Sequence, residues 1–255
     1  MRDGTFIAEF VEQKRDPGSM TCVRGPPGYL PQILRCGEEL SSQETEVVVA
    51  LLTVDRLQSY LIASNGYIDE ALALYRWNVE ISSALFSVLS DVEIALRNSI
   101  DREMQKLNVT VSNHDSWFDS PSVIMSSYCR HNLERARTAL AVGGKPITHS
   151  NIVAELNFGF WRAFLSRQYK DTLWRTSIRF AFPHSPSRQP EYIFTRVRHL
   201  HVLRNRIAHH EPIHNRDIAR DYQVCMEVLN AISPVIAAWS AENSYLLNVL
   251  SEKPL

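Results

Sequence analysis

The middle of the chain carries apolar residues at a helical period. Between residues 68 and 100 these positions advance by alternating steps of four and three, which predicts one face of a helix about 40 residues long. They are Ile68, Leu72, Tyr75, Val79, Ser82, Phe86, Leu89, Glu93, Leu96 and Ile100. A second run has the same spacing: Ile218, Tyr222, Cys225, Leu229, Ile232, Ile236 and Trp239, with Pro234 expected to kink or bend its helix. Strand-like alternation is nearly absent, so the predicted fold class is all-α, a helical bundle with long helices.

The rest of the chain divides into shorter helical patterns and a tail. Helical patterns cover residues 122–140, 151–169 and 191–208, and clusters of glycine and proline near residues 143–146 and 183–190 predict turns. The first 44 residues instead hold five of the nine glycines and four of the twelve prolines, without periodicity. We therefore expect residues 1–45 to form a flexible tail, or to follow from a misassigned start codon, and residues 46–255 to form one helical domain.

Composition limits the class of protein. With 255 residues, 45% of them apolar, the chain is long enough to bury a core. Its longest apolar run, Val47 to Leu52, is far shorter than the roughly 18 residues of a membrane helix, and the N-terminus lacks a secretion signal. The four cysteines, at positions 22, 36, 129 and 225, form neither a CxxC pair nor a secreted disulfide pattern. These features predict a cytoplasmic globular protein with reduced thiols and no membrane partner.

Positive charge is concentrated in one segment of a nearly neutral chain. From Arg162 to Arg206 there are ten Lys and Arg residues against two acids, whereas the whole chain carries a net charge of −1. A basic segment of this kind suits an enzyme that binds a polyanion such as RNA. The alternative is a solvated helical face whose charges are paired in salt bridges.

The segment from Leu203 to Ile213 concentrates side chains with chemical functions. It contains Arg204, Asn205, His209, His210 and Glu211 within about three helical turns. Arginine binds phosphate through a fixed fork of donors, and histidine transfers protons near neutral pH. The combination predicts phosphodiester chemistry on RNA.

The same segment predicts how these side chains are placed on a helix. Ile193, Val197, Leu200, Arg204 and Ile207 follow steps of four and three, so Arg204 is expected on the apolar face and needs a partner there. His201, Asn205 and His209 lie four apart along the edge of that face. Pro212 disfavours helical geometry at Glu211, so the helix should end near His209 or His210. A helix C-terminus favours the protonated form of histidine, which can then donate a proton.

The order of several sequence blocks resembles a known family. Arg204, Asn205 and His209 look like the arginine, polar residue and histidine signature of the HEPN superfamily, and the longer string resembles its Abi-like branch, named for abortive infection in bacteria. The resemblance extends roughly from Val54 to Trp239. Its other blocks are Tyr75 to Asn78, Glu93 to Asn98, Leu156 to Trp161 with Phe158, Gly159 and Phe160, and Trp174.

This resemblance implies a function and a mechanism. Many HEPN proteins are metal-independent ribonucleases, so the chain is expected to be an endoribonuclease of a phage-defence or toxin type, without a cofactor. By resemblance, the RNA 2′-hydroxyl attacks the adjacent phosphate, Arg204 stabilises the developing charge and His209 transfers a proton. Asn205 would orient the histidine or the phosphate. Because two copies of the motif meet across a dimer in related proteins, a homodimer with a composite site is expected.

Several assignments stay open at this level. Either His209 or His210 is the catalytic histidine, although the spacing favours His209. Glu93 is expected either to form a buried pair with Arg97 or to be the partner of Arg204, and Glu93, Arg97, Asn98, His201 and Glu211 are taken as supporting residues.

Three broader alternatives also remain. The histidines at 199, 201, 209, 210 and 214 could be imagined as zinc ligands, but Pro212 interrupts their register and no cysteine pair is near. Trp77, Trp161, Phe158 and Phe160 are expected in the core rather than as stacking platforms for bases. The alternative function is a non-catalytic RNA-binding or partner-binding module. An antitoxin or regulatory RNA is a further expected partner, and the RNA substrate is left open.

Overall fold

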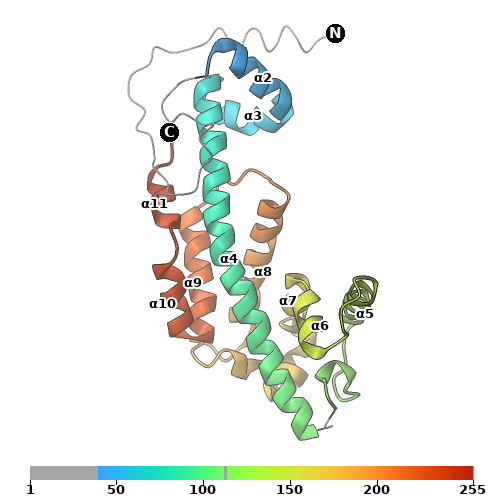
Figure 1. The fold of residues 1–255 in the computed structure, drawn as a ribbon. Helices are drawn as coiled ribbons and strands as arrows, with labels where there is room; N and C mark the ends of the chain where they lie inside the picture. Colours follow the sequence, from blue (N-terminus) through green and yellow to red (C-terminus); the bar gives the residue numbers. More distant parts are fainter. Residues whose placement is uncertain (1–39, 112–113, 255) are drawn as a thin grey trace. The chain divides into compact units, whose positions relative to one another are not determined.

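The structure, a computed structural model, describes residues 40–111 and 114–254. These residues form helices and connecting turns without any β-strand, which confirms the predicted all-α fold class (Figure 1). The first helix of this part, α2, begins at Ser42, where Ser41 and Glu44 form a reciprocal capping box. Residues 42–45 are therefore helical, while residues 1–39 of the predicted tail lie outside the described residues.

The described chain divides into two compact units, whereas the sequence suggested one bundle. The first comprises residues 40–79 and 252–254, and the boundary falls inside the long helix α4 (Ile68–Val111). This unit contains α2 (Ser42–Leu52), α3 (Val54–Ala63) and the start of α4. Its core includes Leu57 and Leu74, and the rings of Tyr60 and Tyr75 meet edge to face at 5.4 Å.

The second unit spans residues 80–251 and contains the segment of interest. Helix α8 packs against α7 and α9, and α5 packs against α6 and α7. The bounds are η1 Trp117–Asp119, α5 Ser127–Val142, α6 His149–Glu155, α7 Phe158–Phe164, η2 Arg167–Tyr169, η3 Lys170–Trp174, η4 Ile178–Ala181, α8 Pro190–Ala208, α9 Ile218–Ile232, α10 Pro234–Glu242 and α11 Leu246–Ser251. The second unit thus places α8 between two other helices.

The buried face of α4 differs from the predicted stripe. The helix is continuous, as expected, but Val79 and Phe86 are exposed, and the buried side chains are shifted by one position. Ile81, Leu85, Val88 and Val92 are each at most 1% exposed. Ile68, Leu89, Leu96 and Ile100 are buried as predicted, so the difference is confined to the middle of the stripe. Apolar residues stand side by side there, as at Leu85 and Phe86, and either one fits a helical period.

Two predicted helices are interrupted by specific local signals. The pattern over residues 151–169 breaks into α6, α7 and η2, because the side chain of Asn157 accepts a hydrogen bond from the Phe160 N–H at 3.0 Å and starts a new helix. Near the C-terminus Pro234 does more than kink a helix. It occupies the first turn of α10, and Ser233 caps that helix, so α9 ends at Ile232.

Polar ties fix α4 to the elements around it in the second unit. Asp101 of α4 accepts hydrogen bonds from Trp117 Nε1 at 2.7 Å and from His149 Nε2 at 2.9 Å. Closer to the middle of α4, Asp91 accepts a hydrogen bond from the Ser240 hydroxyl of α10 at 2.6 Å. The side chains that α4 offers to α8 are therefore held in place at both ends of this stretch.

The structure tests the predictions on membranes and thiols for the described part of the chain only. Within residues 40–111 and 114–254 no helix combines the length and apolarity needed to cross a membrane. Cys129 and Cys225 are buried free thiols, and burial raises the pKa of both. The other two cysteines lie outside the described residues.

Candidate functional site

Helix α8 carries the motif and buries one apolar face. Ile193, Val197 and Leu200 are fully buried, Ile207 is 8% exposed, and Arg204 continues the same face with a half-buried side chain. The predicted stripe on this helix is confirmed over residues 193–207. Arg204 is therefore held by packing while part of its guanidinium faces solvent.

The partner of Arg204 is Glu93 on α4. The Arg204 Nε and the Glu93 Oε2 lie 3.6 Å apart, and the two side chains are 33% and 22% exposed. That distance allows an ion pair but not a hydrogen bond, and Arg204 Nε is buried with no hydrogen-bond partner among the described residues. A loose pair of this kind positions the guanidinium and leaves its donors free for an anion.

The sequence left open whether Glu93 pairs with Arg97 or with Arg204, and the structure shows the second pairing. Glu93 pairs with Arg204 of α8, whereas Arg97 Nε donates to the side chain of its neighbour Asn98 at 3.3 Å. The buried pair of Glu93 with Arg97 is not formed. Arg97 and Asn98 lie on α4 about one turn beyond Glu93, where Arg97 is half-buried and Asn98 is exposed.

Helix α8 ends where the sequence predicted. His209 is the C-terminal cap, and His210 follows with a left-handed φ of 57°. The N–H of His210 bonds to the carbonyl of Ile207 at 2.9 Å and the N–H of Glu211 to that of Arg206 at 2.8 Å. This pair of bonds is a Schellman motif, in which histidine takes the position that usually holds glycine.

The polar side chains at this helix end are open to solvent. His209, His210 and Glu211 are exposed, and Asn205 is half-buried and makes no side-chain hydrogen bond to the described residues. Arg206 points back along the turn, with an Nε to Glu211 Oε2 distance of 3.2 Å and a bond from Nη2 to the carbonyl of Pro212 at 3.3 Å. Glu211 thus neutralises Arg206 rather than Arg204.

His201 lies one turn before Arg204, in a more enclosed setting. Burial lowers its pKa, and the positive charges of Arg162 and Arg204 lower that pKa further. Its ring centroid lies 5.7 Å from that of Phe158 on α7. The pKa of His201 is therefore held below its ordinary value of 6.5, which favours the neutral imidazole.

Close packing of α7 on α8 depends on Gly159. A Cβ at this position would lie 2.6 Å from the Tyr128 hydroxyl and 3.2 Å from His201 Nε2. Both groups therefore approach one point of the backbone that only glycine leaves open. Gly159 thus lets Tyr128, at the start of α5, and His201 of α8 approach the same point of α7.

Comparison with known proteins supports the resemblance seen in the blocks. The profile of the Abi-like protein family matches residues 51–215. The chain belongs to the Abi-like family. No curated protein and no solved structure matches it. The matched range begins three residues before the predicted one and ends before α9, so it includes Glu93, Gly159 and the whole Leu203 to Ile213 segment.

Two blocks of this Abi-like protein that lie far from the motif in the sequence meet α8 in the second unit, whereas the Tyr75 to Asn78 block lies in the first unit. The Glu93 block contacts the motif through Arg204, and the Leu156 to Trp161 block contacts it through Phe158, Gly159 and His201. Trp161, Phe158 and Phe160 are each at most 2% exposed and belong to the core, as predicted. These aromatic residues support the site and do not line it.

Sequence reasoning missed one buried network beside the motif. Asp221 of α9 is 2% exposed, receives two bonds of 2.8 Å from Arg216 and lies 2.6 Å from His199 Nε2 of α8. A signal was present, because Asp221 falls between Ile218 and Cys225 on the apolar face of α9. A carboxylate at such a position needs a buried partner.

The histidines do not gather into a metal centre. Among the residues that the structure describes, no three His, Cys, Asp or Glu side chains lie close enough together to hold an ion. His199 is bound to Asp221, His201 lies beside Phe158 and Gly159, and His209 is exposed at the helix end. The five histidines imagined as zinc ligands are thus distributed over different environments.

Proposed function

We propose that this Abi-like protein is a metal-independent endoribonuclease that acts in the cytoplasm in phage defence or as a toxin. The observation that carries the proposal is the state of Arg204. Its guanidinium is anchored by the apolar face of α8 and by a loose ion pair with Glu93, yet a third of the side chain is open to solvent. Asn205 and His209 lie on the same side of the helix within two turns. A phosphate at Arg204 is therefore within reach of an amide and an imidazole.

The chemistry follows from these three groups. The 2′-oxygen of a ribose attacks the neighbouring phosphorus, and the bond from phosphorus to the 5′-oxygen of the next nucleotide breaks. Arg204 stabilises the negative charge that builds on the phosphoryl oxygens. His209 donates a proton to the departing 5′-oxygen, and Asn205 orients the imidazole or the phosphate. The products are a 2′,3′-cyclic phosphate and a 5′-hydroxyl.

The acid and base roles favour a homodimer. One chain offers one Arg204 and one His209, whereas the reaction needs a base for the 2′-hydroxyl as well as an acid. A twofold axis through the end of α8 would double the set. In support, Val202 is 52% exposed on the same face of α8, seven residues before His209, and offers an apolar contact at this end.

The basic segment would guide RNA to this site. Some of its charges are neutralised, since Lys170 pairs with Glu191 and Arg196 with Glu227. Others form no ion pair with the described residues: Arg162, Arg167, Arg175, Arg188 and Arg198. An antitoxin or regulatory RNA that occupies this surface would keep such an enzyme silent until infection.

Cleavage by purified variants tests the proposal. Arg204→Ala and His209→Ala should each lower the rate of RNA cleavage by at least about a hundredfold and abolish growth arrest on expression. His131→Ala, which removes an exposed histidine of α5, is the matched control and should cleave at the parental rate. RNA binding without cleavage by the parent would instead favour a non-catalytic RNA-binding module. Cleavage by His209→Ala at the parental rate would move the proton transfer to another residue.

A further inference from the structure

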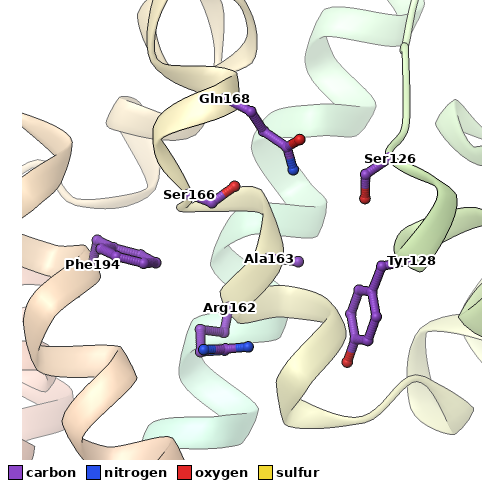
Figure 2. A pocket seen from close by; sticks show the side chains of 7 residues that line it. All are labelled: Ser126, Tyr128, Arg162, Ala163, Ser166, Gln168 and Phe194. Atoms are coloured by element: carbon purple, nitrogen blue, oxygen red, sulfur yellow. The ribbon is translucent and has the colours of Figure 1, made fainter.

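A pocket of about 430 Å³ lies among α5, α7 and α8 in the second unit (Figure 2). Its wall comes from three elements: the start of α5, α7 with the turn that follows it, and α8. The residues that line it are Ser126, Tyr128, Arg162, Ala163, Ser166, Gln168 and Phe194. This size falls in the range of pockets that bind small organic groups.

The pocket combines one positive charge with two aromatic side chains, Tyr128 and Phe194, and several hydrogen-bonding groups. Arg162 contributes the only charge on its lining, and no carboxylate faces it. Arg162 Nε and Ser166 Oγ are buried and have no hydrogen-bond partner among the described residues. Buried polar atoms without partners are uncommon and mark positions at which a ligand can complete the hydrogen bonding. The lining therefore suits an anion that carries a planar, hydrogen-bonding group.

Two wall residues connect the pocket to the motif. The Tyr128 hydroxyl and His201 Nε2 both lie within 3.2 Å of the point where a Cβ on Gly159 would stand. Arg162 and Arg204 both lower the pKa of His201. Phe194 precedes His201 by seven residues on one face of α8, about 10 Å along the axis. The pocket is thus linked to the helix that carries the motif through Tyr128, Gly159 and His201.

We propose that this pocket holds a base of the RNA strand next to the phosphate at Arg204. The inference rests on the proposed function and extends it to the neighbouring nucleotide. The base stacks on the ring of Phe194, its edge bonds to Ser166 and Gln168, and Arg162 binds the phosphate of that nucleotide. Stacking on an aromatic ring tolerates every base, so the site favours single-stranded RNA over a duplex, whose bases are already stacked.

Binding measurements with a non-cleaving chain test this directly. The dissociation constant of a fluorescent single-stranded RNA octamer is measured for His209→Ala alone and combined with Phe194→Leu, Phe194→Tyr or Phe180→Ala. Leucine keeps apolar volume but removes the stacking face, so Phe194→Leu should weaken binding about tenfold. Phe194→Tyr keeps the face, and Phe180→Ala removes an exposed phenylalanine outside this pocket, so both should bind within about twofold of the parent. Thermal melting checks that each variant is folded.

An abasic octamer separates the base from the phosphate. With this probe the difference between Phe194→Leu and its parent should disappear. Equal binding of the normal octamer by both chains, or the same loss with the abasic octamer, would overturn the proposal, because Phe194 would then only pack. Failure of the parent to bind the octamer would overturn it as well. These readouts need no catalysis, so a chain that binds as expected but never cleaves RNA contradicts the proposed function and leaves the pocket assignment intact.

Discussion

At the scale of single residues, burial and two nearby positive charges lower the pKa of His201. Burial is the largest cause that lowers its pKa below the ordinary value of 6.5, and Arg162 and Arg204 add to the effect. The unfolded chain therefore binds a proton at a pH at which the native chain does not. The free energy of unfolding should fall as the pH drops from about 6.5 towards the native pKa of His201.

Removal of one of these charges gives a prediction at this scale. Arg162→Gln should raise the pKa of His201 towards 6.5, because one of the two repelling charges is lost while burial remains. Titration of the His201 ring protons by NMR measures this pKa. Arg175→Gln serves as the control, since Arg175 is exposed and is not among the charges that act on His201. An unchanged pKa in Arg162→Gln would show that Arg162 lies too far from the imidazole to matter.

Residue identities on α8 could be predicted from the sequence, but their partners could not. The spacing of Arg204 among buried apolar residues was sufficient to place it on the inner face. Its partner Glu93 lies 111 residues earlier on another helix, and an ion pair over that separation depends on how α4 and α8 pack. For the same reason periodicity alone left two possible partners for Glu93.

At the scale of elements, a buried carboxylate joins α8 to α9. Asp221 binds Arg216 through both oxygens and also reaches His199, with only 3% of its side chain exposed. Asp221→Ala would leave Arg216 without its partner in a half-buried position. We expect this change to lower the free energy of unfolding by about 3 kcal/mol in urea denaturation.

An exposed ion pair supplies the control for this prediction. Lys170 and Glu191 are 36% and 53% exposed at a distance of 3.2 Å. Glu191→Ala should lower the free energy of unfolding far less than Asp221→Ala does, because solvent screens the pair. If both variants lost the same stability, the network around Asp221 would have no special part in holding α9 to α8.

Element boundaries show where sequence reasoning failed and why. The end of α8 was predictable because Pro212 acts locally, within three residues of the cap. The break between α6 and α7 was missed because Asn157 is compatible with a helix until its side chain caps the next one. The middle of the α4 face was misplaced because adjacent apolar residues, such as Leu85 and Phe86, both fit a helical period and only packing decides between them.

At the scale of the whole molecule, the proposed homodimer predicts complementation between inactive chains. Arg204→Ala retains His209, and His209→Ala retains Arg204. If the site is composite, half of the dimers in an equal mixture contain one chain of each kind, and each of these has one intact site out of two. The mixture should therefore recover about a quarter of the parental cleavage rate. Sedimentation of the parent measures the oligomeric state in parallel. A monomer that cleaves RNA, or a dimer whose mixed chains stay inactive, would refute the composite site.

The ends of the cleaved RNA, produced in the presence of EDTA, test the central claim most directly. If Arg204 and His209 carry out the reaction without a metal, cleavage should continue at the parental rate in EDTA. The products should then carry 2′,3′-cyclic phosphates and 5′-hydroxyls, and Arg204→Ala and His209→Ala should yield neither. Loss of cleavage in EDTA, or products with 5′-phosphates, would contradict the account.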